Sequence, residues 1–522
     1  MTLSILSVLI GMINLDGRTL TSSEVRLVAR GEKVSVAVDA WLNVDKSRAV
    51  VEDIIEQDET VYGINTGFGA LANQTISKDD LSLLQINLIR SHACAIGERM
   101  SKEDTRAMMC IRANSLIKGY SGVQRSVINQ LVTYLNEDIV PVIPRLGSLG
   151  ASGDLAPLSH MALSLIGEGE VWDNDAPVST QEVLKIRGLI GLELGAKDGL
   201  SLINGTSQMC SFLSKSEEAL SNLLPIADLI ACATMESRKC SIKPMDSRVQ
   251  QVRPHNGQVT VAERIRKILN NSQIIDAHKN QTRVQDAYSF RCIPQVHGAV
   301  HQIFTQLQGI LEVEINSATD NPLIFPDTGI TLKDQVVSQG NFHGELLGLI
   351  ADSMSHSIFE LANISERRID QVVDPTRSNL PAFLAKNSGL ESGLMIVHYV
   401  AAAALSELHA GSMPRSAFST PTSGGQEDFV SMGATSCWNL TKSCELLSQV
   451  LACELLIACE ALEYTNLKPS PHVECLYKLV RKVAEPLVSD RSTASEIEKI
   501  SNELYAGGWL ARIEAECGIL PR

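Results

Sequence analysis

Three consecutive small residues, Ala151, Ser152 and Gly153, could turn their own backbone into an electrophile. No side chain hinders the amide nitrogen of Gly153, which can attack the carbonyl carbon of Ala151 and close an imidazolone ring with loss of water. Loss of a second water from Ser152 leaves a methylidene carbon that accepts nucleophiles. Because no standard side chain is an electrophile, a protein that needs one must bind it or make it.

The same run is also typical of an ordinary loop that leads into a helix. Asp154 is a favoured N-cap residue, Pro157 suits a first helical turn, and the apolar residues that follow are spaced as one helical face. Spacing alone favours the plain loop. The two interpretations are compatible, because a helix N-terminus stabilises negative charge that develops beside it.

Further residues could serve such an electrophile, and each has a plainer interpretation. Tyr62 opens a glycine-rich run that ends at Asn73. An exposed tyrosine in such a loop usually serves recognition or packing. To act as a base it would need its pKa, about 10 when unperturbed, to be lowered. Asn204 precedes a glycine, so it forms a turn or cap, or holds a carbonyl oxygen. Arg291, three residues after Tyr288, pairs with an acid or clamps an α-carboxylate.

Candidate ligand-reading residues lie elsewhere in the chain. Glu427, at an expected helix start, complements the helix dipole or selects a ligand that is cationic or donates hydrogen bonds. His92 lies on a predicted helix, where a lone histidine is most often a partly buried residue with satisfied hydrogen bonds. The run from Gly340 to Gly344 opens the longest amphipathic helix and could cap it or face a ligand. No spacing of His, Cys, Asp or Glu matches a metal site, so we expect no metal.

The elements that must position these residues are almost all helices. Apolar residues recur at helical spacing in the segments 81–137, 300–314, 342–370, 392–408 and 435–462. The last two are nearly apolar all round, which indicates burial between helices. Polar segments near 173–180 and 248–285 are interpreted as connections. The pattern predicts an all-α fold with an N-terminal globular part, residues 1–205, that carries the active-site loops, and a bundle of long helices with C-terminal helices, residues 206–522.

Composition excludes several classes of protein. The 522 residues carry a net charge of -15, which argues against a nucleic-acid partner. The 12 cysteines form no CxxC pair, so we interpret them as reduced residues of a cytoplasmic protein. The N-terminus lacks a basic region and a small-residue cleavage site, and no apolar run reaches membrane-spanning length. We therefore expect neither a signal peptide nor a membrane partner.

Together these stretches resemble the methylidene-imidazolone (MIO) family of aromatic amino acid ammonia-lyases and aminomutases. The resemblance covers about Tyr62 to Met432, and its motifs appear in chain order as YGINTGFG, GSLGASGDLAPLSH, LINGT, DAYSFRC, TDNPL and GNFHG. It implies that Ala151, Ser152 and Gly153 form the MIO group without an external cofactor. It also implies a homotetramer whose active sites are built from several subunits.

The family pattern implies a role for each matching residue. Tyr62 would remove the β-proton of the substrate, and Arg291 would bind its carboxylate. Asn204 and Tyr288 would support the electrophile and the substrate amine, while Gln285 and Phe342 would line the pocket. The substrate amine adds to the methylidene carbon and becomes a leaving group. Loss of the β-proton and the amine then gives a trans-α,β-unsaturated acid and ammonia.

The substrate ring is less clearly implied. Met395, the Ser91-His92 pair and the run from Gln426 to Asp428 are similar to histidine-acting members, in which His92 and Glu427 would contact the imidazole. Three positions that flank the ring pocket depart from that pattern. They are His398 in place of the usual glutamine, Gly424-Gly425 in place of Ala-Asn, and Phe429 in place of a frequent histidine.

We therefore expect an ammonia-lyase that converts L-histidine to trans-urocanate. The alternatives are a phenylalanine or tyrosine ammonia-lyase and a 2,3-aminomutase. A helical binding protein without turnover is a further alternative. Against it stands the intact Ala-Ser-Gly run together with Tyr62 and Arg291, because a binder has no need of all three.

Overall fold

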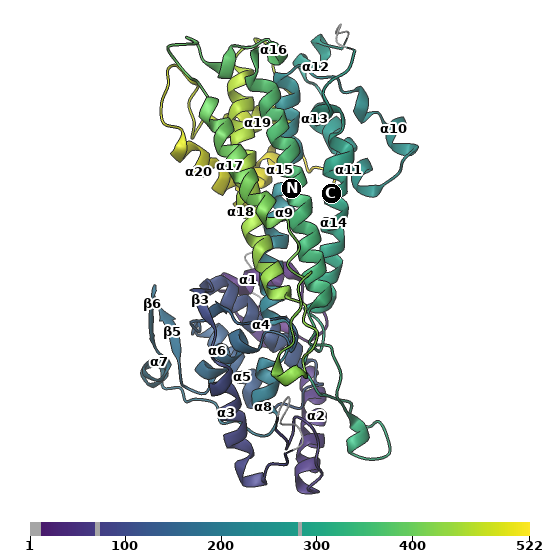
Figure 1. The fold of residues 1–522 in the computed structure, drawn as a ribbon, viewed down its shortest axis with the longest axis vertical. Helices are drawn as coiled ribbons and strands as arrows, with labels where there is room; N and C mark the ends of the chain where they lie inside the picture. The colour runs from purple at the N-terminus through teal and green to yellow at the C-terminus, as the bar shows by residue number, and fades with distance from the viewer. Residues whose placement is uncertain (1–11, 68–73, 280–283) are drawn as a thin grey trace. The chain divides into compact units, whose positions relative to one another are not determined.

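The computed structural model describes residues 12–67, 74–279 and 284–522, so residues 1–11 and residues 68–73 of the glycine-rich run lie outside the description. Among the described residues helices dominate, and the strands pair only in two-stranded sheets (Figure 1). The all-α prediction is confirmed. The chain forms two compact units: unit 1 comprises residues 1–215, 308–351 and 414–438, and unit 2 comprises residues 216–307, 352–413 and 439–522. The predicted domains, 1–205 and 206–522, are each one continuous stretch of sequence, whereas each observed unit combines three separate segments.

Unit 1 contains eight helices of the N-terminal part: α1 Ser22–Ala29, α2 Ala40–Glu56, α3 Leu81–His92, α4 Lys102–Ile117, α5 Arg125–Asn136, α6 Leu155–Leu165, α7 Thr180–Arg187 and α8 Asp198–Ile203. The described strands of this unit are β1 Ile13–Leu15, β2 Val34–Val36, β3 Ile96–Arg99, β4 Pro144–Leu146, β5 Glu170–Asp173, β6 Ala176–Ser179, β7 Leu323–Ile324 and β8 Val336–Val337. Parallel β1 and β2 pair Ile13 with Val34, and the other three pairs are antiparallel.

Unit 2 contains α10 Ser247–Gln251, α11 Asn256–Ile268, α12 Gln273–Ala277, α13 Tyr288–Arg291, α16 Pro375–Ser378, α17 Met395–Gly411, α19 Pro471–Val480, α20 Ala494–Ala506 and α21 Gly508–Cys517. Four long helices have residues in both units: α9 Ser207–Ser237, α14 Ile293–Glu314, α15 Glu345–Val373 and α18 Gly433–Leu462. The interpretation of 248–285 as a connection was wrong, because α10, α11 and α12 occupy much of it. Their shortness, five residues for α10 and α12, left little periodic signal.

The middle helix of unit 1, α4, explains how charged side chains come to lie in the core. Ser101 caps it by accepting a hydrogen bond from the Asp104 amide at 3.0 Å. Every residue from Asp104 to Ile117 is buried. Two arginines on this helix, Arg106 and Arg112, therefore find hydrogen-bond acceptors inside the protein.

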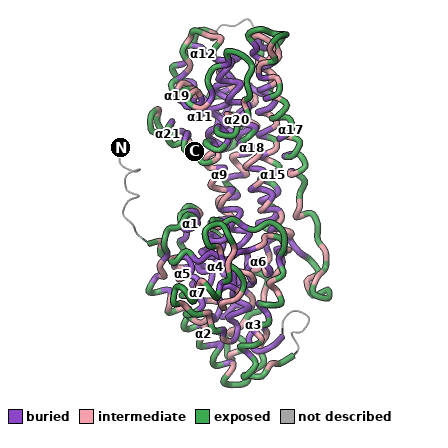
Figure 2. Tube along the Cα trace, turned by 90° about the vertical axis from the view of Figure 1, so that its left-hand side faces the viewer, coloured by how far each residue is buried: buried purple, intermediate pink, exposed green. Residues whose placement is uncertain are grey.

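Buried polar contacts join the long helices within unit 2. Glu454 on α18 accepts from Arg368 on α15 at 2.6 and 2.8 Å, and from Thr234 on α9 at 2.7 Å. All three side chains are buried, so the carboxylate and guanidinium satisfy each other away from water. Figure 2 shows the buried residues along α9, α15 and α18. The predicted burial of residues 435–462 between helices is confirmed. The same prediction for 392–408 was wrong for the single chain, because only Val397, Ala401, Ala404 and Leu408 of α17 are buried.

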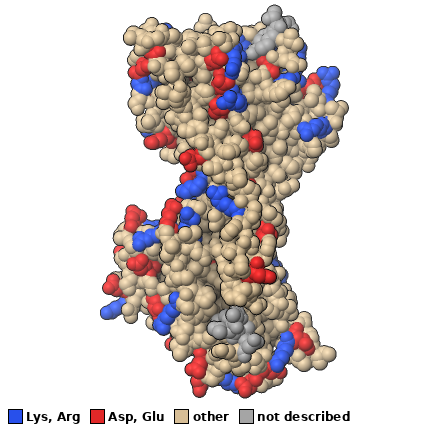
Figure 3. Space-filling view, in the orientation of Figure 1, with Lys and Arg blue, Asp and Glu red and all other residues tan. Residues whose placement is uncertain are grey.

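The apolar helix α9 and most of the cysteines lie in the interior of the protein. Helix α9 is the one described helix long and apolar enough to cross a membrane, but 83% of its apolar window is buried within the protein. Nine of the 12 cysteines are buried, and burial raises the pKa of the Cys453 thiol to about 12. Acidic and basic side chains are interspersed over the face drawn in Figure 3, and large areas of that face carry neither.

Candidate active site

The tripeptide 151–153 lies in the loop immediately before α6, packed against a second turn of chain. Ala151 is buried, and Gly153 has a φ of +72°. A Cβ atom on Gly153 would lie 2.2 Å from the carbonyl oxygen of Gly205, a distance that no side chain tolerates. Next to this contact, the Asp154 amide donates to the same carbonyl at 2.8 Å. Glycine at position 153 is therefore required by the fold as well as by the ring-closing chemistry.

Asp154 occupies the N-cap position of α6 but its side chain caps a different helix. The carboxylate accepts from the amides of Gln208 at 2.8 Å and Met209 at 3.1 Å, in the first turn of α9, and from Ser148 Oγ at 2.8 Å. It makes no side-chain cap bond to α6, so that part of the prediction was wrong. Burial raises the pKa of Asp154 to about 6, although these hydrogen bonds favour the charged form. The residue fastens the tripeptide loop to α9.

Asn204 holds the oxygen that the proposed ring chemistry would leave outside the ring. It follows the last residue of α8, and its Nδ2 donates to the carbonyl oxygen of Ser152 at 3.0 Å. Bond formation between the Gly153 nitrogen and the Ala151 carbon leaves this Ser152 carbonyl intact. The residues present therefore fit the MIO group, with a hydrogen-bond donor already placed on its oxygen.

Glu427 contacts the hydroxyl group that the second dehydration would remove. Ser152 Oγ donates to Glu427 Oε1 at 2.8 Å, and Thr422 Oγ1 donates to Glu427 Oε2 at 2.9 Å. Glu427 lies in a loop, six residues before α18 begins at Gly433, so its expected place at a helix start was wrong. In the turn before it, Gly424 and Gly425 have φ values of +63° and +88°, which glycine adopts without strain.

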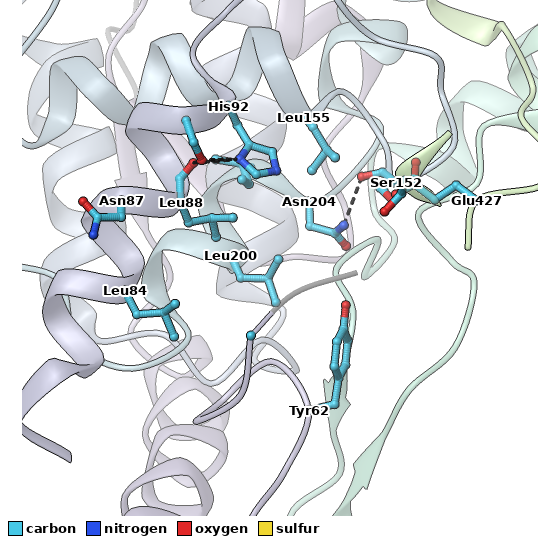
Figure 4. A pocket seen from close by; sticks show the side chains of 14 residues that line it. Tyr62, Leu84, Asn87, Leu88, His92, Ser152, Leu155, Leu200, Asn204 and Glu427 are labelled. Carbon is cyan, nitrogen blue, oxygen red and sulfur yellow. Dashed lines mark hydrogen bonds between the residues drawn. The ribbon is translucent and has the colours of Figure 1, made fainter. Parts of the chain in front are cut away.

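A cavity of about 560 Å³ opens beside Ser152 within unit 1. Its walls are largely apolar, formed by Leu84, Leu88, Leu155, Leu200 and Ile203. The polar groups that line it are Tyr62, Asn87, Ser91, His92, Ser152, Asn204, Ser423 and Glu427. Figure 4 shows the hydroxyl of Tyr62 directed toward Asn204 and Ser152. Apolar walls with a few convergent polar groups are typical of a small-molecule site.

His92 ends α3, and its ring has a defined orientation in this cavity (Figure 4). Nδ1 lies 2.8 Å from the carbonyl oxygen of Leu88 and 3.0 Å from Ser91 Oγ. Since a carbonyl oxygen only accepts, Nδ1 carries the proton and donates it to Leu88. In the tautomer with its proton on Nδ1, the ring has Nε2 as a hydrogen-bond acceptor.

A second cavity, of about 570 Å³, lies against the tripeptide and shares Tyr62, Ser152, Asn204 and Glu427 with the first. Its remaining lining is mostly polar, but it includes Phe342. Phe429 also lines it and stacks on His343 with ring centroids 6.0 Å apart. Phe342 and the unusual Phe429 therefore lie beside the tripeptide, within the same unit.

The other predicted site residues, Gln285, Tyr288, Arg291, Met395 and His398, belong to unit 2. Gln285 and Arg291 line a cavity of about 280 Å³, and the Arg291 guanidinium lies 4.5 Å from the centroid of the Tyr288 ring. Met395 begins α17. His398 Nε2 lies 2.6 Å from Glu366 Oε1, and this nitrogen is therefore engaged by a carboxylate. Roles for these residues beside the tripeptide remain predictions.

Sequence reasoning missed part of the cavity wall. Leu84 and Leu88 precede His92 by eight and four residues on α3, so they share its helical face. That spacing could have identified them. Leu200 lies one turn of α8 before Asn204, and the same argument applies to it.

The sequence is similar to those of known lyases. The family model described as aromatic amino acid lyase matches residues 20–482. The histidine ammonia-lyase of Myxococcus xanthus is 43% identical over 505 residues, covering 96% of this chain and 98% of that protein. The histidine ammonia-lyase of Bos taurus is 42% identical over 493 residues, covering 93% of this chain and 74% of that protein.

Solved structures show the same fold. Histidine ammonia-lyase from Trypanosoma cruzi superposes with a TM-score of 0.89 at 37% identity, covering 97% of this chain and 96% of that one. Tyrosine aminomutase from Streptomyces globisporus superposes with a TM-score of 0.92 at 34% identity, covering 98% of this chain and 100% of that one. Relatives with this fold thus include both a lyase and an aminomutase.

Proposed function

The chain belongs to the aromatic amino acid lyase family and is a carbon–nitrogen lyase, and we propose that it eliminates ammonia from L-histidine to give trans-urocanate. One observation carries the proposal. The Ala151-Ser152-Gly153 loop, with Asn204 bonded to the Ser152 carbonyl, faces a cavity whose polar lining includes His92 and Glu427. We further propose that the enzyme acts in the cytoplasm, without a nucleic-acid or membrane partner.

The electrophile arises from the chain itself. The Gly153 nitrogen bonds to the Ala151 carbonyl carbon with loss of one water, and the Ser152 hydroxyl leaves with the Cα proton as a second water. The resulting group supplies an electrophilic carbon that takes up the substrate amine. Asn204 holds the Ser152 oxygen throughout, and the Gly205 carbonyl leaves no room for a side chain at position 153.

The remaining residues orient the substrate and move its proton. Tyr62 directs its hydroxyl toward Ser152 across the cavity and would accept the β-proton (Figure 4). His92 Nε2 and the Glu427 carboxylate both present hydrogen-bond acceptors to the cavity. An imidazole ring brings an N–H donor to such acceptors, whereas a phenyl ring brings none. This chemistry favours histidine over phenylalanine.

A tyrosine lyase or 2,3-aminomutase is the second candidate function. A phenol hydroxyl can also donate to His92 Nε2, and the aminomutase fold is shared at 34% identity. Glu427 favours histidine in its protonated form, because an imidazolium has two N–H donors, one for each acceptor, whereas a phenol has one donor and leaves the second acceptor unsatisfied.

We propose that the active sites are shared between the subunits of a homotetramer. Arg291, Tyr288 and Gln285 are expected to bind the substrate, yet they belong to unit 2, where Arg291 lines a separate cavity. Apolar side chains on α17 are left exposed, with Ile396 at 56% and Tyr399 at 62% of full exposure. A second copy of the chain that covers α17 would bury this surface and could bring Arg291 to the tripeptide of its neighbour.

The substrate is tested by mixing the purified protein separately with histidine, tyrosine and phenylalanine. Ultraviolet absorbance follows the conjugated acid, and chromatography detects any β-amino acid. We expect urocanate from histidine. Turnover of tyrosine or phenylalanine without turnover of histidine would refute the histidine assignment, and a β-amino acid would identify an aminomutase.

Mass spectrometry tests the electrophile independently. The intact protein should weigh two waters less than its sequence, and Ser152→Ala should abolish both this loss and turnover. Ser159→Ala is the matched control, because Ser159 lies in the same motif but its hydroxyl bonds to the Leu155 carbonyl in its own helix. An active protein of full sequence mass contradicts the mechanism.

Subunit mixing tests the shared site. Ser152→Ala and Arg291→Gln subunits are each expected to form inactive homotetramers. If sites combine residues of different subunits, coexpression of the two variants restores part of the activity, because some sites receive both intact residues. Mixed tetramers without activity would show that each site belongs to one chain.

A further inference from the structure

A buried arginine lies behind the turn that holds the tripeptide. Arg112 on α4 is fully buried, and its Nη1 donates to the backbone carbonyl of Asn204 at 2.6 Å. A Cβ atom on Gly205 would lie 2.2 Å from this Nη1 and 2.6 Å from Thr319 Oγ1. Glycine at position 205 is therefore what allows the guanidinium to reach the Asn204 carbonyl.

The same asparagine connects this guanidinium to the reactive loop. Its backbone oxygen accepts from Arg112, while its Nδ2 donates to the Ser152 carbonyl oxygen at 3.0 Å. One residue thus separates a buried positive charge from the oxygen of the proposed electrophile. Asn204 is itself 4% exposed, so solvent screens this chain of hydrogen bonds only weakly.

The surroundings of Arg112 indicate that it serves this contact rather than an ion pair. The neighbouring Asp320 carboxylate accepts hydrogen bonds from Lys197 Nζ at 2.6 Å and from Ser201 Oγ at 2.8 Å. The side chains of Asp320 and Lys197 are both fully buried. Within the described residues, Nε and Nη2 of Arg112 have no hydrogen-bond partner in the protein. Burial lowers the pKa of Arg112 to about 10, which leaves it charged at neutral pH.

We propose that Arg112 is a positioning residue of the active site, which fixes Asn204 on the Ser152 carbonyl oxygen and polarises that hydrogen bond. The inference rests on the proposed function, because it concerns the same electrophile. A preorganised donor at an oxygen where negative charge develops contributes about 100- to 1000-fold to kcat in enzymes of known mechanism. Arg112 acts through Asn204 and touches no reacting atom.

The test compares Arg112→Met and Arg112→Lys with a matched control, Arg106→Met. Arg106 lies on the same helix, is 4% exposed, and also donates to backbone carbonyls, those of Val28 at 2.9 Å and Leu135 at 3.0 Å, in addition to its ion pair with Asp138 at 2.8 Å. We expect Arg112→Met to lower kcat about 100-fold with KM changed less than about threefold, and Arg112→Lys to recover about tenfold of this. Arg106→Met should lower Tm to a similar extent and leave kcat per folded subunit within about twofold.

Intact mass and Tm, measured on the same samples, make the outcomes decisive. A folded Arg112→Met enzyme that is slow, or that fails to lose two waters, supports the inference, provided that Arg106→Met keeps both properties. Wild-type kcat in folded Arg112→Met overturns it, as do equal losses in Arg106→Met. If Arg112→Met does not fold, Arg112→Lys replaces it in the test. A lowered kcat in Arg112→Lys then supports the inference, and an unchanged kcat overturns it. A wild-type protein without water loss or turnover would instead refute the proposed function.

Discussion

Replacing Glu427 with glutamine changes one acceptor in the cavity wall and little else. In the unchanged protein Thr422 Oγ1 donates to Glu427 Oε2 at 2.9 Å, and the glutamine carbonyl can still accept this hydrogen bond. The other oxygen, Oε1, accepts from Ser152 Oγ at 2.8 Å, and that hydroxyl is the one lost when the electrophile forms. Oε1 is then available to the substrate. In the variant an amide donor occupies its place, which repels an imidazole N–H.

The magnitude follows from the type of hydrogen bond. A hydrogen bond to a charged group contributes about 1.5–3 kcal/mol, and a buried donor left without its acceptor costs a similar amount. We therefore expect kcat/KM for histidine to fall about 10- to 150-fold in Glu427→Gln. A phenyl ring has no polar hydrogen to lose a partner, so the effect on phenylalanine should stay below about threefold.

Steady-state rates with histidine measure the first effect. Phenylalanine, as a substrate or as a competitive inhibitor, measures the second. Intact mass shows whether the variant still loses two waters, which separates ring recognition from formation of the electrophile. Thr422→Val is the companion variant, because it keeps the carboxylate and removes only its second anchor, and it should have the smaller effect. Equal losses for histidine and phenylalanine in Glu427→Gln would show that Glu427 does not read the ring.

Three further changes test other parts of the structure. Gly153→Ala should abolish both the two-water mass loss and turnover while the circular dichroism stays helical, because its Cβ would lie 2.2 Å from the Gly205 carbonyl oxygen; an active variant contradicts this packing. Arg291→Lys keeps the charge but loses the bidentate fork, so KM for histidine should rise about tenfold or more, and an unchanged KM would remove Arg291 from the carboxylate site. Burial raises the pKa of Glu236 from 4.5 to about 7, so the folded state holds its proton more tightly and the stability from this group is complete below pH 4.5 and lost as the pH rises through 7. The free energy of unfolding in urea should therefore rise by about 3 kcal/mol for Glu236→Gln relative to wild type as the pH is raised from 4 to 8. The opposite trend would contradict a raised pKa of Glu236.

Long helices could be predicted because their signal repeats along the chain. The apolar periodicity of 342–370 and 435–462 corresponds to α15 and α18 within three residues, and that of 300–314 to α14, which begins seven residues earlier at Ile293. Each of these helices buries a face along many turns, so local pattern and final packing agree. The five-residue helices α10 and α12 have no such repeat, and their segment was interpreted as a connection.

Side-chain partners from distant segments could not be predicted in this way. Asp154 has the residue type and position of a cap for α6, but the amides of Gln208 and Met209, more than 50 residues further on, bind its carboxylate. Glu427 was expected at a helix start because an acidic pair favours that position. Its loop is instead held by Thr422 and by Ser152, 275 residues away.

The Asn204-Gly205 pair shows why the same dipeptide supports two interpretations. As sequence it is a turn, and in the structure it does end α8. Its side-chain amide reaches Ser152, and the missing Cβ at Gly205 admits the Arg112 guanidinium, just as the missing Cβ at Gly153 admits the Gly205 backbone. The turn and the electrophile support are thus one structure, since the backbone that places the amide also requires the glycine. Arg112 had no sequence signal of its own, because a charged residue inside a helical pattern is ordinarily solvated, and only the packing of α4 against this turn gives it a role.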